Sequence, residues 1–303
     1  MHNLLRATRA LLVLDLCMAV SALVGWPEGG TIVAGNAVRF DRETWERNLA
    51  RPNVSGTVPI TGFDISQRWP SQEVNGWTLS LNITSDVPDS QSMNSNDTAT
   101  RTFTGTSISI TAPESIQGAF ANETALDETT WKICVSVVPN GPHEDQSADN
   151  GTCGFLSSQC VTDLQQAYAD KFSESQNCYG TPPSTPSSCG DMVDTSNFQV
   201  QQLPLTSVNG TEVFVTASES HEAGDETAWN NATRQVWPIL TVWGWNTRAR
   251  TPGDSSPQVQ LSCIRASTVE PESNPPSSAG STYRGAAMLA GGIASATTLY
   301  ASL

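Results

Sequence analysis

Basic residues are scarce in this sequence, in which 15 lysines and arginines stand against 30 aspartates and glutamates. The formal net charge at pH 7 is −15. A surface this acidic repels the phosphate backbone of nucleic acids and anionic lipid headgroups. We therefore expect neither nucleic acid nor a membrane surface as a direct partner. The same acidity would also help to keep an extracellular protein in solution.

Familiar motifs of hydrolases and metal sites are missing as well. The sequence has no Gly-x-Ser-x-Gly elbow, no pair of Asp-Thr/Ser-Gly loops and no His-Glu-x-x-His pattern. Beyond the first residues only His143 and His221 remain, too few for the commonest all-histidine zinc or copper sites. These absences favour a non-enzymatic protein without a resident cofactor.

The N-terminal segment has the order of charged, apolar and small residues that is typical of a secretory signal peptide. Two arginines precede an apolar run from Ala10 to Val24, which is too short to span a bilayer. We predict a signal peptide over residues 1–22, with cleavage after Ala22 or Gly25. Asp15 interrupts the apolar run, so an uncleaved leader is the alternative.

Cysteines and glycosylation acceptors also indicate that the chain is secreted. Loss of the leader removes Cys17, and the even number left in an exported chain predicts three disulfides among Cys134, Cys153, Cys160, Cys178, Cys189 and Cys263. Asn-x-Ser/Thr acceptors, spread along the interior of the chain, lie at Asn53, Asn82, Asn96, Asn122, Asn150, Asn209 and Asn231. We therefore predict a secreted, disulfide-bonded glycoprotein.

The C-terminal end resembles a signal for attachment of a glycosylphosphatidylinositol (GPI) lipid. A linker rich in Ser and Pro over residues 267–284 is followed by residues 285–303, which carry no charge. Small residues, a polar spacer and an apolar terminus form the order of such a signal. The candidate attachment residues are Ser277, Ser278 and Gly280. A weak transmembrane anchor and a disordered tail are the alternatives.

The region between these ends, residues 23–266, has a length that suits one β-sandwich or barrel. Several segments alternate apolar with polar residues and are rich in Thr, Val, Ile and aromatics, as in strands with one buried face. They span residues 76–84, 102–111, 131–138, 198–207, 211–218, 235–245 and 258–266. We predict a mainly β fold, an antiparallel β-sandwich-like domain. Asn209-Gly210 predicts a hairpin between the segments that flank it.

One stretch breaks the strand pattern, because apolar residues between Cys160 and Phe172 recur on one side at helical spacing. Disulfides at the flanks of so short a helix would hold it on the sheet. We predict a helical insertion over about residues 153–190. Cys134 and Cys263 lie in predicted strands, and a bridge between them is one of the 15 pairings that six cysteines allow.

Three pieces of the chain resemble a group of secreted, GPI-type glycoproteins of filamentous fungi. The pieces are Cys153-Gly154-Phe155-Leu156 with Cys160 and the helix at Asp163-Leu164, the strand Leu261-Ser262-Cys263-Ile264-Arg265-Ala266, and the Ser/Pro linker with its apolar tail. The resemblance covers the chain only in part. It implies a cell-surface or wall-associated protein and supplies no catalytic residues.

An acidic segment offers the candidate catalytic residues, namely Glu219, His221, Glu222, Asp225 and Glu226. Glu222 and Glu226 could serve glycoside hydrolysis, in which one carboxyl group protonates the leaving oxygen and the other attacks or activates water. The same oxygens could bind Ca²⁺. A solvated acidic loop is the simpler interpretation, since charge runs usually lie at the surface.

Trp243 and Trp245 are the candidate carbohydrate-binding residues. They lie two positions apart in a predicted strand and therefore share a face. Exposed indoles could stack on sugar rings, whereas buried indoles would form part of a sandwich core. The exposure of the two side chains distinguishes these interpretations.

The leading functional hypothesis is a cell-surface or wall-associated glycoprotein that acts in adhesion, carbohydrate contact or wall organisation. Its partner would be a cell-wall polysaccharide or an extracellular protein, and it would meet a membrane only through a GPI lipid. The alternatives are a carbohydrate-active hydrolase that uses the acidic segment and a secreted effector that binds a host protein.

Overall fold

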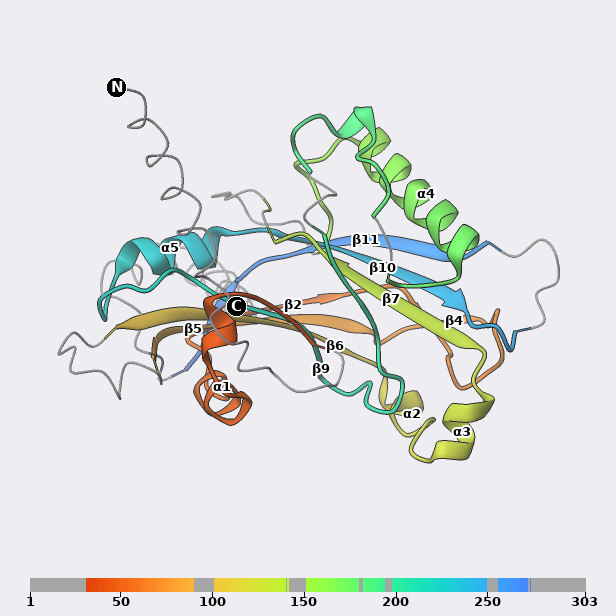
Figure 1. Cartoon of the computed structure of the whole chain (residues 1–303), viewed down its shortest axis with the longest axis horizontal. Coiled ribbons are helices and arrows are strands. Elements are labelled where there is room, and N and C mark those ends of the chain that lie inside the picture. The colour runs from red at the N-terminus through yellow and green to blue at the C-terminus, as the bar shows by residue number, and fades with distance from the viewer. Residues whose placement is uncertain are drawn as a thin grey trace, which may run out of the picture.

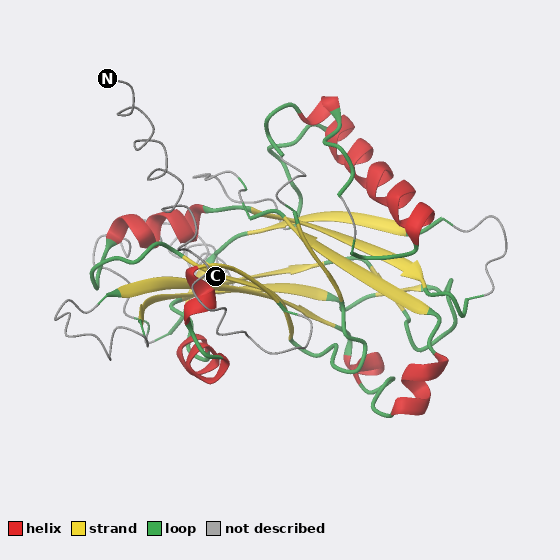
Figure 2. Cartoon of the chain, in the orientation of Figure 1, coloured by secondary structure: helices red, strands yellow, loops and turns green. Residues whose placement is uncertain are grey.

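The computed structural model describes residues 31–89, 101–139, 141, 151–179, 182–193, 198–249, 256–271 and 273. Within these ranges the chain forms two β-sheets that lie face to face, with helices on their outer surfaces and at their ends (Figure 1, Figure 2). Side chains from both sheets share one apolar core. The mainly β, sandwich-like fold predicted from the sequence is confirmed.

Several predicted features lie outside the described residues. They are the signal peptide, the apolar tail, His143, the acceptors Asn96 and Asn150, and the attachment candidates Ser277, Ser278 and Gly280. Among the residues that are described, no helix is both long and apolar enough to cross a bilayer.

The larger sheet has six strands in the order β1-β9-β6-β5-β2-β12. In chain order they are β1 (Ile32–Gly35), β2 (Val54–Pro59), β5 (Thr78–Pro88), β6 (Thr102–Thr111), β9 (Thr211–Ala217) and β12 (Thr268–Val269). Neighbouring strands are antiparallel, except that β1 runs parallel to β9. The alternation is clear in the first half of β5, where Leu79 and Leu81 are buried while Thr78, Ser80 and Asn82 are only partly buried.

The smaller sheet has four antiparallel strands in the order β11-β10-β7-β8. These are β7 (Trp131–Val137), β8 (Gln199–Gln202), β10 (Trp237–Trp245) and β11 (Gln258–Ile264). A separate two-stranded ribbon pairs β3 (Gly62–Phe63) with β4 (Glu73–Val74). Every residue of β10 is buried. The reason is that β10 is a central strand of this sheet, with the larger sheet on one face and the helix over residues 158–175 on the other.

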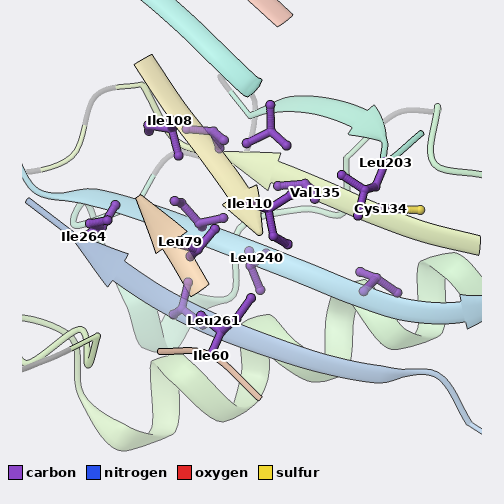
Figure 3. Close-up of a cluster of buried hydrophobic side chains, with 14 of the residues drawn as sticks. Ile60, Leu79, Ile108, Ile110, Cys134, Val135, Leu203, Leu240, Leu261 and Ile264 are labelled. Atoms are coloured by element: carbon purple, nitrogen blue, oxygen red, sulfur yellow. The ribbon is translucent and has the colours of Figure 1, made fainter. Parts of the chain in front are cut away.

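Large aromatic side chains fill the space between the two sheets. The ring centroid of Phe214 in β9 lies 5.4 Å from that of Trp237 in β10. The rings of Trp77 and Trp243 are 4.8 Å apart. Figure 3 shows aliphatic members of the same cluster, among them Leu79, Ile110 and Val135. Each fully buried side chain of this kind stabilises the fold by about 1.5–3 kcal/mol.

A second apolar cluster lies on the outer face of the larger sheet. It is covered by the turn η1 (Asn36–Arg39) and by α1 (Arg42–Leu49). Trp45 and Leu49 point from α1 toward the sheet at Gly105. A Cβ at Gly105 would lie 3.1 Å from the Trp45 ring and 3.2 Å from Leu49, so the glycine permits the close approach of α1.

Short helices lie at the two ends of the sandwich. The helices α2 (Glu114–Gln117) and α3 (Glu123–Glu128) lie at one end, and α5 (Glu226–Arg234) lies at the other (Figure 1). Trp229 of α5 is fully buried in the main core, which fixes that helix against the sheets.

The predicted helical insertion is confirmed as α4 (Ser158–Ser175), which packs on the outer side of β10 and β11 (Figure 1). The Ser157 hydroxyl caps it by accepting a hydrogen bond from the Cys160 amide at 3.1 Å. Its buried residues follow a spacing of four: Cys160, Leu164, Tyr168 and Phe172. Gly244 of β10 makes room for Phe172, because a Cβ there would lie 2.3 Å from the phenyl ring.

Three disulfides tie this insertion down, namely Cys134–Cys178, Cys153–Cys263 and Cys160–Cys189. Their number agrees with the prediction, but the suggested bridge between Cys134 and Cys263 is wrong. Cys134 lies in β7 and Cys263 in β11, with β10 between them. Two strand spacings amount to about 10 Å, beyond the roughly 7 Å between Cα atoms that a disulfide can span. Each strand is instead bonded to a segment that flanks α4. The third bond joins α4 to the turn η3 (Ser187–Cys189).

The predicted hairpin at Asn209-Gly210 is also wrong. The strand before it ends at Gln202 and pairs with β7, whereas β9 pairs with β6 and β1 in the other sheet. The intervening segment therefore crosses between the sheets, and it buries Leu203, Leu205 and Val208 on the way. Gly210 does adopt a positive φ of 66°. A turn residue of this kind permits a reversal but does not determine which strands pair.

Candidate functional site

The loop between β3 and β4, residues 64–72, lies at the α2/α3 end of the sandwich (Figure 1). Its residues line two hollows. Hydrogen bonds to the start of β7 hold this loop in place. The Trp69 amide donates to the Thr130 hydroxyl at 2.7 Å, and the Trp131 indole N–H donates to the Gln67 carbonyl at 2.7 Å. The loop is thus fixed to the four-stranded sheet on both sides of Arg68.

The first hollow, here called the aromatic hollow, has a volume of about 220 Å³. Its walls include the rings of Phe63, Trp69, Trp131 and Trp243. Phe63 stacks on Trp131 at 5.8 Å and meets Trp243 edge to face at 5.7 Å. Polar groups come from three side chains, those of Ser71, Ser256 and Gln258. Rings with a few convergent polar groups are typical of a small-ligand site.

The second hollow, here called the polar hollow, has a volume of about 540 Å³ and lies on the other side of the same loop. Arg68, Arg248, Asp127 and Glu128 line it together with the buried ring of Phe120. Arg248 places Nη2 3.5 Å from the Asp127 carboxylate, and both side chains are more than half exposed. Such an exposed ion pair contributes little to stability, and both charged groups stay in contact with solvent.

Both hollows are suited to binding. Aromatic faces accept the apolar side of a ring, while hydroxyl, amide and guanidinium groups orient its polar edge. In the part of the chain that the structure describes, no group of three or more His, Cys, Asp or Glu side chains is placed to hold a metal ion.

Trp243 and Trp245, the predicted carbohydrate-binding residues, are both in the core. Trp243 is 1% exposed and Trp245 is 6% exposed. Trp245 is packed against Trp69 at 4.5 Å and against Phe172 at 5.4 Å. Neither indole is exposed at the outer surface of the sheet, so the core interpretation holds. Trp243 nevertheless forms part of the wall of the aromatic hollow.

The acidic segment does not line either hollow. Asp225 is the N-cap of α5 and accepts hydrogen bonds from the amides of Ala228 at 3.1 Å and Thr227 at 2.7 Å. These bonds hold the pKa of the Asp225 carboxyl below its usual value. Glu222 and Glu226, the candidate catalytic pair, are exposed.

The rest of the acidic segment has structural contacts. The backbone of His221 bridges to Thr102 of β6, and its Nε2 lies 3.1 Å from the Thr104 hydroxyl. Glu219 is exposed and precedes this bridge. The segment therefore pairs with the first residue of β6 and starts α5, which agrees with a solvated loop.

Five of the predicted glycosylation acceptors lie within the described residues. Asn122, Asn209 and Asn231 are exposed, whereas Asn53 and Asn82 are half-buried. Asn122 caps α3 through Oδ1, which accepts a hydrogen bond from the Ala125 amide at 2.7 Å. Asn53 uses Oδ1 in the same way toward the Ser85 amide at 2.7 Å. Both geometries involve the side-chain oxygen and not the nitrogen to which a glycan is attached.

Sequence reasoning missed the loop that lines the two hollows. Phe63, Trp69 and Trp77 follow one another closely in the chain, and this density of aromatics was the available signal. It also missed the carboxyl group of Glu212, which lies in β9 near Trp45 of α1. Burial raises the pKa of Glu212 to about 7.

No family model matches this sequence, and neither a curated protein nor a solved structure matches it. The three disulfides indicate an extracellular or secreted protein, since such bonds persist in oxidising compartments.

Proposed function

We propose that this protein is a cell-surface or wall-associated glycoprotein whose aromatic hollow binds carbohydrate. The observation that carries the proposal is that four aromatic side chains line this hollow, with Ser71, Ser256 and Gln258 among its polar lining residues. A sugar ring has an apolar C–H face and a polar hydroxyl edge. The hollow has matching surfaces for both.

The size of the aromatic hollow restricts the ligand. Its volume of about 220 Å³ lies below the range of about 300–1,000 Å³ that is usual for pockets that hold drug-sized molecules. One sugar unit, at the end of a chain or on a branch, is the expected occupant. The neighbouring polar hollow, with Arg68 and Arg248, would contact further units of the same polysaccharide.

The positions of the glycosylation acceptors and of the predicted lipid anchor support the same proposal. The exposed acceptors Asn122, Asn209 and Asn231 do not line the aromatic hollow, so glycans attached there would not occupy it. The predicted GPI lipid would tether the domain to the plasma membrane or the cell wall, as the resemblance to fungal GPI-type glycoproteins implies. Adhesion or wall organisation would follow from binding polysaccharide while tethered.

The test is binding of the purified protein to an array of cell-wall oligosaccharides and polysaccharides, followed by calorimetry with the best ligand. Trp69→Ala removes a wall of the hollow, and we expect it to abolish binding. Gln258→Ala removes an exposed polar group at the hollow, and we expect about tenfold weaker binding because a hydrogen bond to the sugar is lost. Gln202→Ala is the matched control, since Gln202 is an exposed glutamine in a strand of the same sheet and does not line the hollow.

Two results would contradict the proposal. One is a wild-type protein that binds nothing on the array. The other is binding that both Trp69→Ala and Gln258→Ala leave unchanged. Loss of binding in Gln202→Ala as well would show that the site lies elsewhere on the four-stranded sheet.

A further inference from the structure

The outer face of the larger sheet carries a group of small polar side chains around Asn82 of β5. The sequence neighbours of Asn82, Leu81 and Ile83, are fully buried in the core between the sheets, so Asn82 points to the opposite, outer face. The side chains around it, here called the hydroxyl face, come from three adjacent strands and are those of Ser55, Thr57, Ser80, Ser107 and Ser109.

The strand register places these hydroxyl groups close to Asn82. Ser55 of β2 and Ser107 of β6 lie directly opposite Asn82 on the two neighbouring strands. Side chains in such positions have Cβ atoms about 4.5–5.5 Å apart. Ser80 precedes Asn82 by two residues on the same strand and therefore shares its face. Serine and threonine are shorter than asparagine, so they leave room above the sheet for a group attached to Asn82.

Several polar groups of the hydroxyl face have no partner among the described residues. The side-chain amide of Asn82 and the hydroxyls of Ser107 and Ser109 make no hydrogen bond there, and none of these atoms is sealed from solvent. The Ser80 hydroxyl has only the Thr57 hydroxyl, at 3.4 Å. Asn82 therefore differs from Asn53 and Asn122, whose side-chain oxygens accept backbone hydrogen bonds.

The hydroxyl face is bounded on both sides. Helix α1 lies along one side of it, on the outer surface of the larger sheet (Figure 1), and places Trp45 and Leu49 over Gly105 of β6. On the other side Glu270, which follows β12, accepts a hydrogen bond from the Ser55 hydroxyl. Asn82 lies between these limits and is half-buried.

We propose that Asn82 carries an N-linked glycan whose first N-acetylglucosamine lies on the hydroxyl face. Asn82 begins the acceptor Asn82-Ile83-Thr84. Glycosylation joins the amide nitrogen of Asn82 to the anomeric carbon of the sugar. That nitrogen loses one proton, and the bond from the anomeric carbon to the diphosphate of a lipid-linked oligosaccharide breaks. The acetamido and hydroxyl groups of the sugar then supply hydrogen-bond partners to Ser80, Ser107 and Ser109.

Covalent attachment makes this contact effective although each hydrogen bond is weak. One such bond contributes about 0.5–1.5 kcal/mol. The attached sugar is present at a high effective concentration, so a few of these bonds suffice to hold it against the sheet. By contrast, we expect the glycan on the exposed residue Asn231 of α5 to extend into solvent.

The experiment follows the release of glycans by a peptide N-glycosidase, which must reach the first sugar and converts each occupied asparagine to aspartate. Protein purified from a glycosylating eukaryotic host is digested in its native form and after reduction and heating, and mass spectrometry of peptides gives the rate at each acceptor. In the native protein we expect release at Asn82 to be about tenfold slower than at Asn231, because the bound sugar must first leave the sheet. After denaturation the two rates should agree. An unoccupied Asn82, or equal rates in the native protein, would overturn the proposal.

Variants separate binding by the hydroxyls from the half-buried position of Asn82 itself. Ser80→Ala combined with Ser107→Ala removes two hydroxyls without adding bulk, and native release at Asn82 should become severalfold faster. Ser187→Ala combined with Ser207→Ala is the matched control, since both are exposed serines outside the hydroxyl face, and it should leave the rate unchanged. Release at Asn82 that stays as slow without the Ser80 and Ser107 hydroxyls would refute the assignment.

Discussion

The carboxyl group of Glu212 makes the stability of the sandwich depend on pH. Glu212 lies in β9 beside Ser109 of β6, and Trp45, Arg42 and Glu46 of α1 are its neighbours. Burial raises the pKa of Glu212 from 4.5 to about 7, which outweighs the opposite effects of the Trp45 indole and Arg42, while Glu46 acts in the same direction as burial. The folded protein therefore holds this proton over a pH range in which the unfolded chain releases it.

The sign and size of the effect follow from linkage. Between pH 4.5 and about 7 the folded state binds more protons at Glu212 than the unfolded state does, so the free energy of unfolding falls as the pH rises. A separation of about 2.5 pH units at about 1.4 kcal/mol per unit gives a loss of at most about 3.5 kcal/mol. Partial access of water to this half-buried group will reduce that figure.

Replacing Glu212 by Gln removes the titration and keeps an oxygen that can accept from the Trp45 indole. We expect E212Q to be more stable than the wild type at pH 8, by up to about 3 kcal/mol, and nearly equal to it at pH 4. Urea unfolding of both proteins from pH 4 to pH 8 measures the difference. E73Q is the control, because Glu73 is exposed in β4. An advantage of E212Q that does not grow with pH would refute the reasoning.

Further predictions concern the caps, the disulfides and the processing of the chain. Asp225→Ala should destabilise the protein by about 1 kcal/mol in urea unfolding, while Asp225→Asn should retain the cap. Replacing both Cys153 and Cys263 by Ser opens the longest disulfide loop and should cost about 4–5 kcal/mol. Asn231→Gln should remove one glycan and increase gel mobility by one step, and an unchanged mobility would contradict glycosylation at this acceptor. A GPI-specific phospholipase should release the protein from intact cells, and retention would contradict the lipid anchor.

Features that depend on local periodicity were predictable from the sequence. The helix α4 shows its buried face in four residues spaced by four, and β6 spans the same residues as the predicted strand. Strand β2 was not predicted, because its Val-Ser-Gly-Thr-Val-Pro sequence contains two residues that are unfavourable in strands. Its Gly56 is required by the fold, since a Cβ there would lie 2.0 Å from the Arg265 carbonyl.

Features that depend on contacts between distant segments were not predictable. The hairpin prediction failed because Asn209-Gly210 describes a turn and carries no information on the sheet that each flanking strand joins. The disulfide pairing depends on the position of β10 between β7 and β11, which only the sheet order reveals. The aromatic hollow likewise combines Phe63, Trp131 and Trp243 from three separate strands.

The Cys153–Cys263 bond has a mechanical consequence for a chain pulled at its ends. Tension that enters from the C-terminal side can detach the two-residue strand β12 but then meets Cys263. From there the load passes through sulfur directly to Cys153, and the intervening polypeptide, including α4 and β10, is bypassed. Stretching would thus lengthen the molecule only through residues outside the loop that the Cys153–Cys263 bond closes. Strand β10 and the core residues it carries would bear no load.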